Sequence, residues 1–505
     1  MTERPPITAS RAAALVCVVV LTCLSRIPFR LHVPYGLDSV QFVLALEKFD
    51  VRLHQPHPPG YFVFVLLGRV LNGIIHDPVQ SYEWLNIILS GLTVGLVFLL
   101  SEEIFDEHFG LSSAILMSTS ALFWHHGEVA LSNMTDCFLT CLLAWMCWKV
   151  ISGRTESLLA SALVLGIAGG VRQNTLLFLL PLWLFAASTV PWRKVVGGAT
   201  CLVLTVCSWY LPMAHLSGGI AAYQRALSDH WLNSNWHGVT VSWIPFNGIV
   251  IFYFLLLGTG LGVLALFLSF LFYLEEAGIR KRWQELRFRF FSIWILPPLL
   301  FFLLIYSHPT QTGHSLIYLP ALVLLLPPSL FWLRKKWQTV SVALFAVTNL
   351  GCFLVADTAV SRPRMERYEQ DIRQMSELVR EKHSPADTIL VNMDFMFIGF
   401  RVFMYHLPEY RCFQPRLYEL SGSKKMFGGW RHQTSLVDQI KVPQTIKYFV
   451  TNADELAKNP DLASGFTLDH YSPDHIEVTS SGLKLFCGEI SMLADLFPQI
   501  PFEIE

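Results

Sequence analysis

The chain has 505 residues, of which 53% are hydrophobic and only 15% are charged, and its formal net charge is −1. Soluble domains carry about 25% charged residues, so this composition excludes a wholly soluble enzyme and a disordered chain. The near-zero net charge excludes a nucleic-acid binder attracted by charge alone. Residues 361–505 hold 36 charged side chains, whereas residues 1–360 hold 39, roughly 11% of that part. This split predicts a polytopic membrane region over 1–360 and a soluble domain over 361–505.

Eleven mostly apolar runs in the first part are predicted to be membrane-spanning helices, because about 17–25 such residues cross the hydrocarbon core. They cover residues 11–29, 82–101, 111–127, 136–152, 157–171, 174–190, 195–213, 246–273, 290–306, 315–333 and 337–357. The first run is a span rather than a signal peptide, because no small-residue cleavage site follows it. If the stretch 157–190 were one helix instead of two, the orientation of everything after it would invert.

The distribution of lysine and arginine sets the predicted orientation. With the N-terminus in the cytoplasm, the cytoplasmic segments contain 14 of these residues, and the outer segments before residue 360 contain seven. An odd number of spans then places the C-terminal domain outside the cytoplasm. We therefore expect a multi-pass integral membrane protein, with a bacterial inner membrane favoured over the endoplasmic reticulum.

The first outer loop, about residues 30–81, is predicted to contain two helices lying in the membrane interface, at 37–49 and 60–75. Three prolines between them predict an extended path, and Pro59-Gly60 predicts a turn. Asp38 follows a glycine at the start of the first of these helices. It is a candidate for chemistry at the membrane surface, or an N-cap of the helix.

The other outer loops also contain carboxylates, histidines or an arginine, whereas the inner loops contain mainly lysine and arginine. The polar outer residues of interest are Glu128, Asp136, Arg172, Arg225, His308 and His314. This asymmetry predicts a polar cavity at the outer face, covered by the C-terminal domain.

The C-terminal domain is predicted to be a small α/β domain. Residues 367–382 and 395–404 are predicted helices, and strands are predicted at 388–392, at 445–451 and within the alternating stretch 476–488. Cys412 and Cys487 are the only cysteines outside the predicted spans. They could form one disulfide in an oxidising compartment, or be two unrelated thiols.

The order of these motifs resembles the GT-C glycosyltransferases that take a sugar from a polyprenyl-phosphate carrier, such as dolichyl-phosphate-mannose protein mannosyltransferases and lipid A aminoarabinose transferases. The resemblance covers about residues 10–357 and implies a GT-C-like membrane fold. Its motifs are Tyr35-Gly36-Leu37-Asp38, His57-Pro58-Pro59-Gly60-Tyr61, Met134-Thr135-Asp136, Gly170-Val171-Arg172-Gln173-Asn174 and Gly313-His314-Ser315-Leu316-Ile317-Tyr318-Leu319-Pro320. Many relatives carry an Asp-Glu pair in the first loop, but Ser39 follows Asp38 here. Whether a divalent metal takes part is therefore left open.

The resemblance implies an inverting transfer of a sugar from a polyprenyl-phosphate donor to a glycan, lipid or protein acceptor at the outer face of the membrane. A carboxylate takes the acceptor proton, which assigns the role of base to Asp38. Asp136 or Glu128 is the candidate second carboxylate, with helix capping as the alternative for Asp136. The resemblance implies no cofactor firmly and leaves a divalent metal possible. The implied partners are the donor, the acceptor and the lipid bilayer, without nucleic acid.

The leaving phosphate needs positive charge rather than an acid. Arg172 is the first candidate for this role, with a snorkelling anchor as the alternative, and Arg225 is the second, with a solvated loop charge favoured. Substrate contacts are assigned to His54, His57, Tyr61, His308 and His314. For His54 and His57, loop packing or acceptor contact is favoured over metal ligation.

Two other functions compete with this interpretation. A transporter or flippase of lipid-linked sugars would show broken helices with charges near mid-membrane and internal repeats. Here the charges lie mainly in loops and the sequence has no repeat, which favours an enzyme. A non-catalytic membrane scaffold would not need the histidines and carboxylates of the outer loops.

Overall fold

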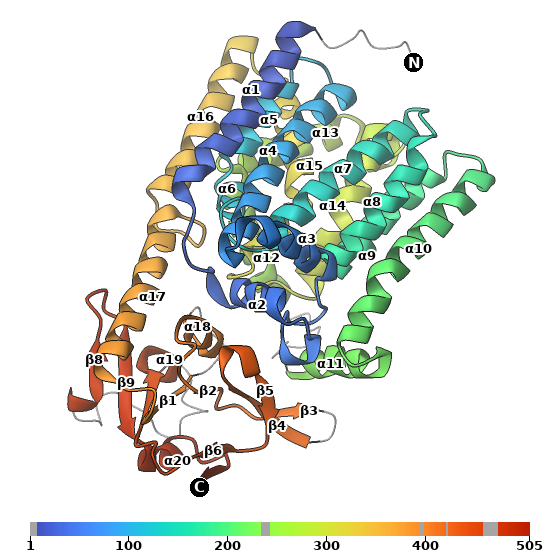
Figure 1. The fold of residues 1–505 in the computed structure, drawn as a ribbon. Coiled ribbons are helices and arrows are strands. Elements are labelled where there is room, and N and C mark those ends of the chain that lie inside the picture. The colour runs from blue at the N-terminus through green and yellow to red at the C-terminus, as the bar shows by residue number, and fades with distance from the viewer. Residues whose placement is uncertain (1–7, 234–242, 393–397, 421–422, 458–472) are drawn as a thin grey trace. The chain divides into compact units, whose positions relative to one another are not determined.

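The computed structural model describes residues 8–233, 243–392, 398–420, 423–457 and 473–505 (Figure 1). The chain divides into two compact units. Unit 1 comprises Met1–Arg30, Tyr61–Pro212 and His237–Arg364, and unit 2 comprises Leu31–Gly60, Met213–Trp236 and Met365–Glu505. The predicted soluble domain over 361–505 therefore folds together with two earlier segments of the chain.

Unit 1 is helical, and each of the eleven predicted apolar runs falls on a helix or on two consecutive helices. The helices are α1 (Ala9–Arg26), α3 (Phe62–Ile75), α4 (Pro78–Ile104), α5 (Gly110–Thr119), α6 (Ala121–His126), α7 (Asn133–Ile151), α8 (Ser157–Val171), α9 (Gln173–Ala187), α10 (Trp192–Leu216), α12 (Ile244–Thr259), α13 (Gly262–Arg282), α14 (Leu286–Leu304), α15 (Leu319–Ser329) and α16 (Lys335–Leu354). Within the described residues, six helices are long and apolar enough to cross a membrane, or seven if α12 and α13 form one span. The chain is a multi-pass membrane protein.

The predicted run 246–273 is not one straight helix. It forms α12 and α13, which are bent by 110° at a short break. Gly260 begins this break with φ +56°, a backbone conformation that glycine adopts without steric cost. The prediction that 157–190 forms two helices is confirmed, because α8 ends before Arg172 and α9 begins after it.

A close helix contact and a partly buried ion pair join α1 to α4 in unit 1. A Cβ atom placed on Gly91 of α4 would lie 2.3 Å from the Cys23 sulfur of α1, so only glycine permits this approach. Near the other end of α1, Arg11 pairs with Glu102 of α4 at 2.5 Å. This pair explains why an acidic segment occurs among loops that are otherwise basic.

Unit 2 is an α/β domain, as predicted. Its helices are α2 (Gly36–Glu47), α11 (Ile220–Asn233), α17 (Arg362–Lys382), whose first residues belong to unit 1, α18 (Phe400–His406), α19 (Ala453–Ala457) and α20 (Leu493–Leu496). Its strands are β1 (Thr388–Val391), β2 (Cys412–Phe413), β3 (Tyr418–Leu420), β4 (Ser423–Gly429), β5 (Ser435–Val437), β6 (Ile440–Val442), β7 (Tyr448–Asn452), β8 (Ile476–Val478), β9 (Lys484–Glu489) and β10 (Phe502–Ile504).

The main sheet has the strand order β3-β4-β2-β1-β7-β9-β8, with β5 paired to β4, and β6 pairs separately with β10. Strand β1 runs parallel to both β2 and β7, and the other pairs of this sheet are antiparallel. Buried side chains such as Ile389, Phe449 and Phe486 form one face of its core. The predicted strand stretch 476–488 is a hairpin of β8 and β9 that turns through Gly482 at φ +95°.

The two predicted helices of the first outer loop are confirmed as α2 and α3, and the predicted turn is present because the Gly60 amide donates to the His57 carbonyl at 3.0 Å. The predicted strand 445–451 is β7, shifted by a few residues. Of the predicted helix 395–404, residues 395–397 lie outside the described residues, and α18 covers the remainder from Phe400.

Cys412 and Cys487 do not form a disulfide, so that prediction is wrong and the alternative of two separate thiols is confirmed. Cys412 lies on β2 and Cys487 on β9, and the strand order places β1 and β7 between them. Three inter-strand spacings amount to about 14 Å. Bonded cysteines need Cα atoms about 4.4–6.8 Å apart, so the sheet itself keeps the sulfurs from pairing.

We therefore expect ten alkylatable thiols in the unfolded chain without any reductant. The check is intact-mass spectrometry after denaturation with excess maleimide, with a reduced sample as the reference. Equal mass gains in both samples are expected. A deficit of two additions in the unreduced sample would contradict the arrangement of the sheet.

Candidate functional site

In unit 2, Asp38 lies in the first turn of α2. The N-cap position is Tyr35, which makes no side-chain capping bond, so the interpretation of Asp38 as the N-cap is wrong. Instead, the hydroxyl of Tyr368 on α17 accepts a hydrogen bond from the Gly36 amide at 3.0 Å and donates to the Pro34 carbonyl at 3.3 Å. Because Tyr368 satisfies the first helical amide, the carboxylate of Asp38 is not needed for that purpose.

His57 lies beside Asp38. Its Nδ1 is 3.7 Å from the Asp38 carboxylate and 2.6 Å from the Gln41 side-chain oxygen. The amide oxygen of Gln41 can only accept, so Nδ1 carries the proton and donates to it. Because Gln41 is three residues after Asp38 on the same helical face, α2 fixes the imidazole next to the carboxylate. About a third of the Asp38 side chain is exposed to solvent, at 35%.

Two further histidines complete this cluster. The His230 ring of α11 is 5.4 Å from His54 and 6.4 Å from His57, and the His54 ring also packs 5.0 Å from Phe427. Burial lowers the pKa of His230 to about 4, against the opposing effect of Asp38, and burial lowers the pKa of His54 well below its usual value. Both imidazoles are therefore neutral near pH 7 and act as hydrogen-bonding groups rather than cations.

The loop that carries these histidines is held by its own backbone and by the C-terminal segment. Asp50 and Gln55 exchange two backbone hydrogen bonds, at 2.7 and 3.1 Å. The buried guanidinium of Arg401 donates to the Leu53 carbonyl at 2.6 Å, and the Tyr223 hydroxyl donates to the Pro59 carbonyl at 2.9 Å. The predicted substrate contacts His54 and His57 thus belong to a loop of unit 2 that is tied down by several hydrogen bonds.

In unit 1, a second polar cluster surrounds the break between α8 and α9. Arg172 has extended backbone angles there and lies within electrostatic range of Asp136, His126 and His314. Its guanidinium is also 6.0 Å from the ring centre of Tyr61, the residue that precedes α3. Of these groups, Asp136 is the one whose charged form Arg172 stabilises.

Asp136 is buried and accepts a hydrogen bond from the Thr175 hydroxyl at 2.6 Å. The N-cap of α7 is Ser132, so the capping interpretation of Asp136 is wrong. Near it, Gly313 packs tightly against α7, because a Cβ atom there would lie 2.3 Å from the Asn133 side chain. This approach lets the Thr312 hydroxyl meet His126 Nε2 at 3.1 Å.

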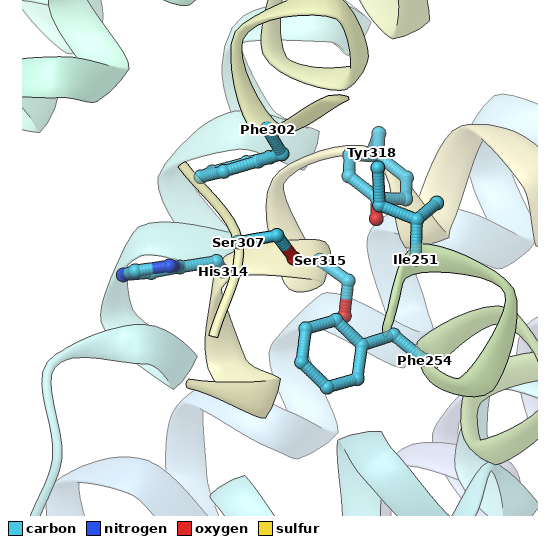
Figure 2. A pocket seen from close by; sticks show the side chains of 7 residues that line it. All are labelled: Ile251, Phe254, Phe302, Ser307, His314, Ser315 and Tyr318. Carbon is cyan, nitrogen blue, oxygen red and sulfur yellow. The ribbon is translucent and has the colours of Figure 1, made fainter. Parts of the chain in front are cut away.

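His314 lines a small pocket in unit 1, together with Ile251, Phe254, Phe302, Ser307, Ser315 and Tyr318 (Figure 2). The imidazole stacks on Phe302 with the ring centres 5.2 Å apart. The lining side chains leave no room even for a water molecule between them, so this hollow is not a formed small-molecule site. His308, predicted with His314, is exposed and bonds Thr310 at 2.8 Å.

Two candidate residues lie outside both clusters. Glu128 is fully buried, accepts a hydrogen bond from the Trp124 indole and interacts electrostatically with the buried Arg26, so its contacts are those of a buried charge partner. Arg225 is exposed on α11, which is the environment of a solvated charge.

Sequence reasoning missed several members of the clusters, namely Gln41, His126, Thr175, His230, Thr312 and Phe427. Gln41 could have been found, because it follows Asp38 at helical spacing. The others approach from segments that are distant in the sequence, and no local pattern marks them.

The buried His230 makes the stability of unit 2 dependent on pH. Because the folded pKa of about 4 lies below the ordinary value of about 6.5, the stability is complete above pH 6.5 and is lost as the pH falls toward 4. We expect the unfolding temperature, followed by tryptophan fluorescence in detergent, to fall less over this window in His230→Gln than in the wild type.

His432→Gln is the matched control, because that imidazole is in the same unit and its side chain is 68% exposed. The control should follow the wild-type curve. Parallel curves for His230→Gln and wild type would show that His230 does not resist protonation in the folded protein.

Comparison with known proteins supports the fold. Residues 56–211 match a family model described as dolichyl-phosphate-mannose-protein mannosyltransferase. No curated protein matches the sequence significantly. Crystal structures of ArnT from Cupriavidus metallidurans, bound to undecaprenyl phosphate and in the apo state, both match with a TM-score of 0.54 and 11% identity. The first match covers 95% of this chain and 98% of ArnT, and the second covers 94% and 97%.

The archaeal oligosaccharyltransferase AglB from Archaeoglobus fulgidus, crystallised with an inhibitory peptide and a dolichol-phosphate, also matches, with a TM-score of 0.46 and 11% identity. That match covers 90% of this chain and 71% of AglB, and at this level it supports no conclusion about the chain. The likeness to ArnT shows the fold. The predicted resemblance is thereby confirmed, and the chain has an ArnT-like GT-C fold with a C-terminal α/β domain.

Proposed function

We propose that this protein is a glycosyltransferase that transfers a sugar from a polyprenyl-phosphate carrier to an acceptor at the outer face of a membrane. The fold is that of ArnT, which has been crystallised with undecaprenyl phosphate, and the matching family model is that of mannosyltransferases. The observation that carries the proposal is the partly exposed carboxylate of Asp38, which caps no helix and has His57 beside it.

In the proposed reaction, the acceptor hydroxyl or amine attacks C1 of the sugar while Asp38 takes its proton. The bond between C1 and the phosphate oxygen breaks, and the oxygen leaves with the electron pair. A phosphate monoester is a weak base, so it needs no general acid, only a compensating charge. A single displacement inverts the configuration at C1.

The remaining residues of the two clusters have supporting roles in this proposal. His57, fixed by its hydrogen bond to Gln41, positions Asp38 and presents a polar edge to the acceptor. In unit 1, Arg172 binds the carrier phosphate. Asp136, which accepts a hydrogen bond from Thr175, interacts electrostatically with that guanidinium. We place the reaction in a bacterial inner membrane, with the N-terminus in the cytoplasm and unit 2 outside.

Replacing Asp38 by Asn is expected to lower sugar transfer by about 10²–10⁴-fold, because general-base catalysis contributes that much. The assay supplies a panel of radiolabelled polyprenyl-phosphate sugars and membrane acceptors to the purified protein in liposomes. Glu47→Gln is the matched control, since Glu47 ends the same helix and pairs with Arg431 at 2.5 Å instead. It should transfer at the wild-type rate.

Wild-type transfer by Asp38→Asn would remove Asp38 from the mechanism. Movement of the donor between leaflets by the wild type, without any transfer, would instead indicate a flippase. If the wild type neither transfers sugar nor moves any donor between leaflets, the result would favour a non-catalytic scaffold.

A second measurement distinguishes Arg172 from Arg225 as the residue that binds the donor phosphate. Loss of a charge-assisted hydrogen bond costs about 1.5–3 kcal/mol, so Arg172→Gln should lower kcat/KM for the donor by roughly 10–150-fold. Arg225 is exposed, and Arg225→Gln should change the same value by about twofold or less. The reverse order would assign the phosphate to Arg225.

A further inference from the structure

Three potential metal ligands converge in the C-terminal segment of unit 2, away from the residues used above. His383 Nε2 is 3.3 Å from the Cys487 sulfur and 3.4 Å from Glu477 Oε2. All three donor atoms lie within 4.8 Å of one another, and all three residues are partly buried. The transfer reaction gives none of them a role.

The fold brings these residues together from three segments. Glu477 on β8 is the register partner of Leu485 on β9. Leu485 and Cys487 point to the same face of their strand, so Glu477 and Cys487 are diagonal neighbours on that face. His383 follows the last residue of α17, and its carbonyl accepts a hydrogen bond from the Tyr410 hydroxyl at 2.7 Å.

A nucleophilic triad would use a different geometry. In a triad the thiol and the acid occupy opposite nitrogens of the imidazole, so that one nitrogen takes the proton while the other is held by the acid. Here both Cys487 and Glu477 face the same nitrogen, Nε2. Three atoms with lone pairs that converge on one point are instead arranged for a cation.

The distances fit a tetrahedral zinc ion. With Zn–S near 2.3 Å and Zn–N or Zn–O near 2.0–2.2 Å, two ligand atoms of a tetrahedral site are about 3.3–3.6 Å apart. The two separations at His383 are 3.3 and 3.4 Å. A sulfur, an imidazole nitrogen and a carboxylate oxygen are also the ligand types that zinc accepts.

The surrounding charges are compatible with such an ion. A thiolate and a carboxylate together neutralise a divalent cation, and Lys382 Nζ contacts only the other carboxylate oxygen, Oε1, at 3.3 Å. A thiol binds a metal as the thiolate, so metal binding would displace a proton from Cys487. The nearby His475 uses its Nδ1 to contact the Cys487 backbone carbonyl at 2.9 Å.

We propose that His383, Glu477 and Cys487 bind one Zn²⁺ ion, with a fourth position for water or an external ligand. The ion joins the C-terminal end of α17 to the β8–β9 hairpin, and so fixes the helix against the edge strands of the sheet. This site is independent of the proposed transfer reaction, and either can fail without the other.

The test uses the full-length protein in detergent, without a polyhistidine tag, after removal of metals by a chelator. Co²⁺, which replaces Zn²⁺ and is coloured, is titrated into the reduced protein. We expect one equivalent to bind, with the ligand-field absorption of a tetrahedral site and a thiolate-to-cobalt charge-transfer band, and one equivalent of Zn²⁺ to remove both signals.

Cys487→Ser should abolish the charge-transfer band, and Cys412→Ser, which removes another thiol of the same unit, should retain it. Glu477→Gln should keep the band but weaken Co²⁺ binding by at least about 10–100-fold, because even outer partners of a metal site contribute that much. This variant keeps the proposal testable if the Cys487 variant fails to fold. No charge-transfer band in the wild type, or an unchanged band in Cys487→Ser, would overturn the proposal and leave a hydrogen-bonded cluster.

Discussion

The hydrogen bond from the buried Arg401 guanidinium to the Leu53 carbonyl ties the first loop of the chain to its C-terminal segment. A fully buried charge is costly unless it meets strong acceptors, and a backbone carbonyl in a tight loop is such an acceptor. Tyr368 makes an equivalent link at the start of α2. Together with the bond from the Tyr223 hydroxyl to the Pro59 carbonyl, these links hold the segment that bears Asp38 and His57.

Unit 1 meets the same constraint with different partners. Charges among apolar helices persist only where other polar groups compensate them. Arg26 donates to the carbonyls of Thr22 and Ser118, at 3.1 and 2.7 Å, and interacts with Glu128. Arg172 interacts with Asp136, which in turn accepts from Thr175. The two charged residues of the first group are buried, whereas the second group lies at the break between α8 and α9.

The imidazoles of unit 2 show how burial defines a chemical role. His54 and His230 are held neutral because water is excluded from them. The imidazole that contacts Asp38 is that of His57, whose Nδ1 lies 3.7 Å from the carboxylate.

Much of the fold could be predicted because its determinants are local. Apolar runs of sufficient length must become helices in a bilayer, where every backbone group needs an internal partner, and α8 and α9 were separable because Arg172 interrupts an apolar run. The helix α2, the turn at Gly60 and the strand β7 follow from periodicity and from residues with restricted backbone angles. Asp38 and Arg172 are polar residues at defined points of that pattern, and their proposed roles come from the family resemblance.

The sequence by itself determined the helices, the separation of a polar C-terminal segment and the presence of polar residues at the ends of the apolar runs. Only the tertiary structure decided that residues 31–60 fold with that segment, that His230 meets His54, and that Cys487 lies beside His383 rather than bonded to Cys412. The physical reason is the separation in sequence of the residues in contact. Hydrogen bonding and burial along one helix produce a periodic pattern in the sequence. Contacts between residues more than a hundred positions apart depend on how complete elements pack, and they produce no local pattern.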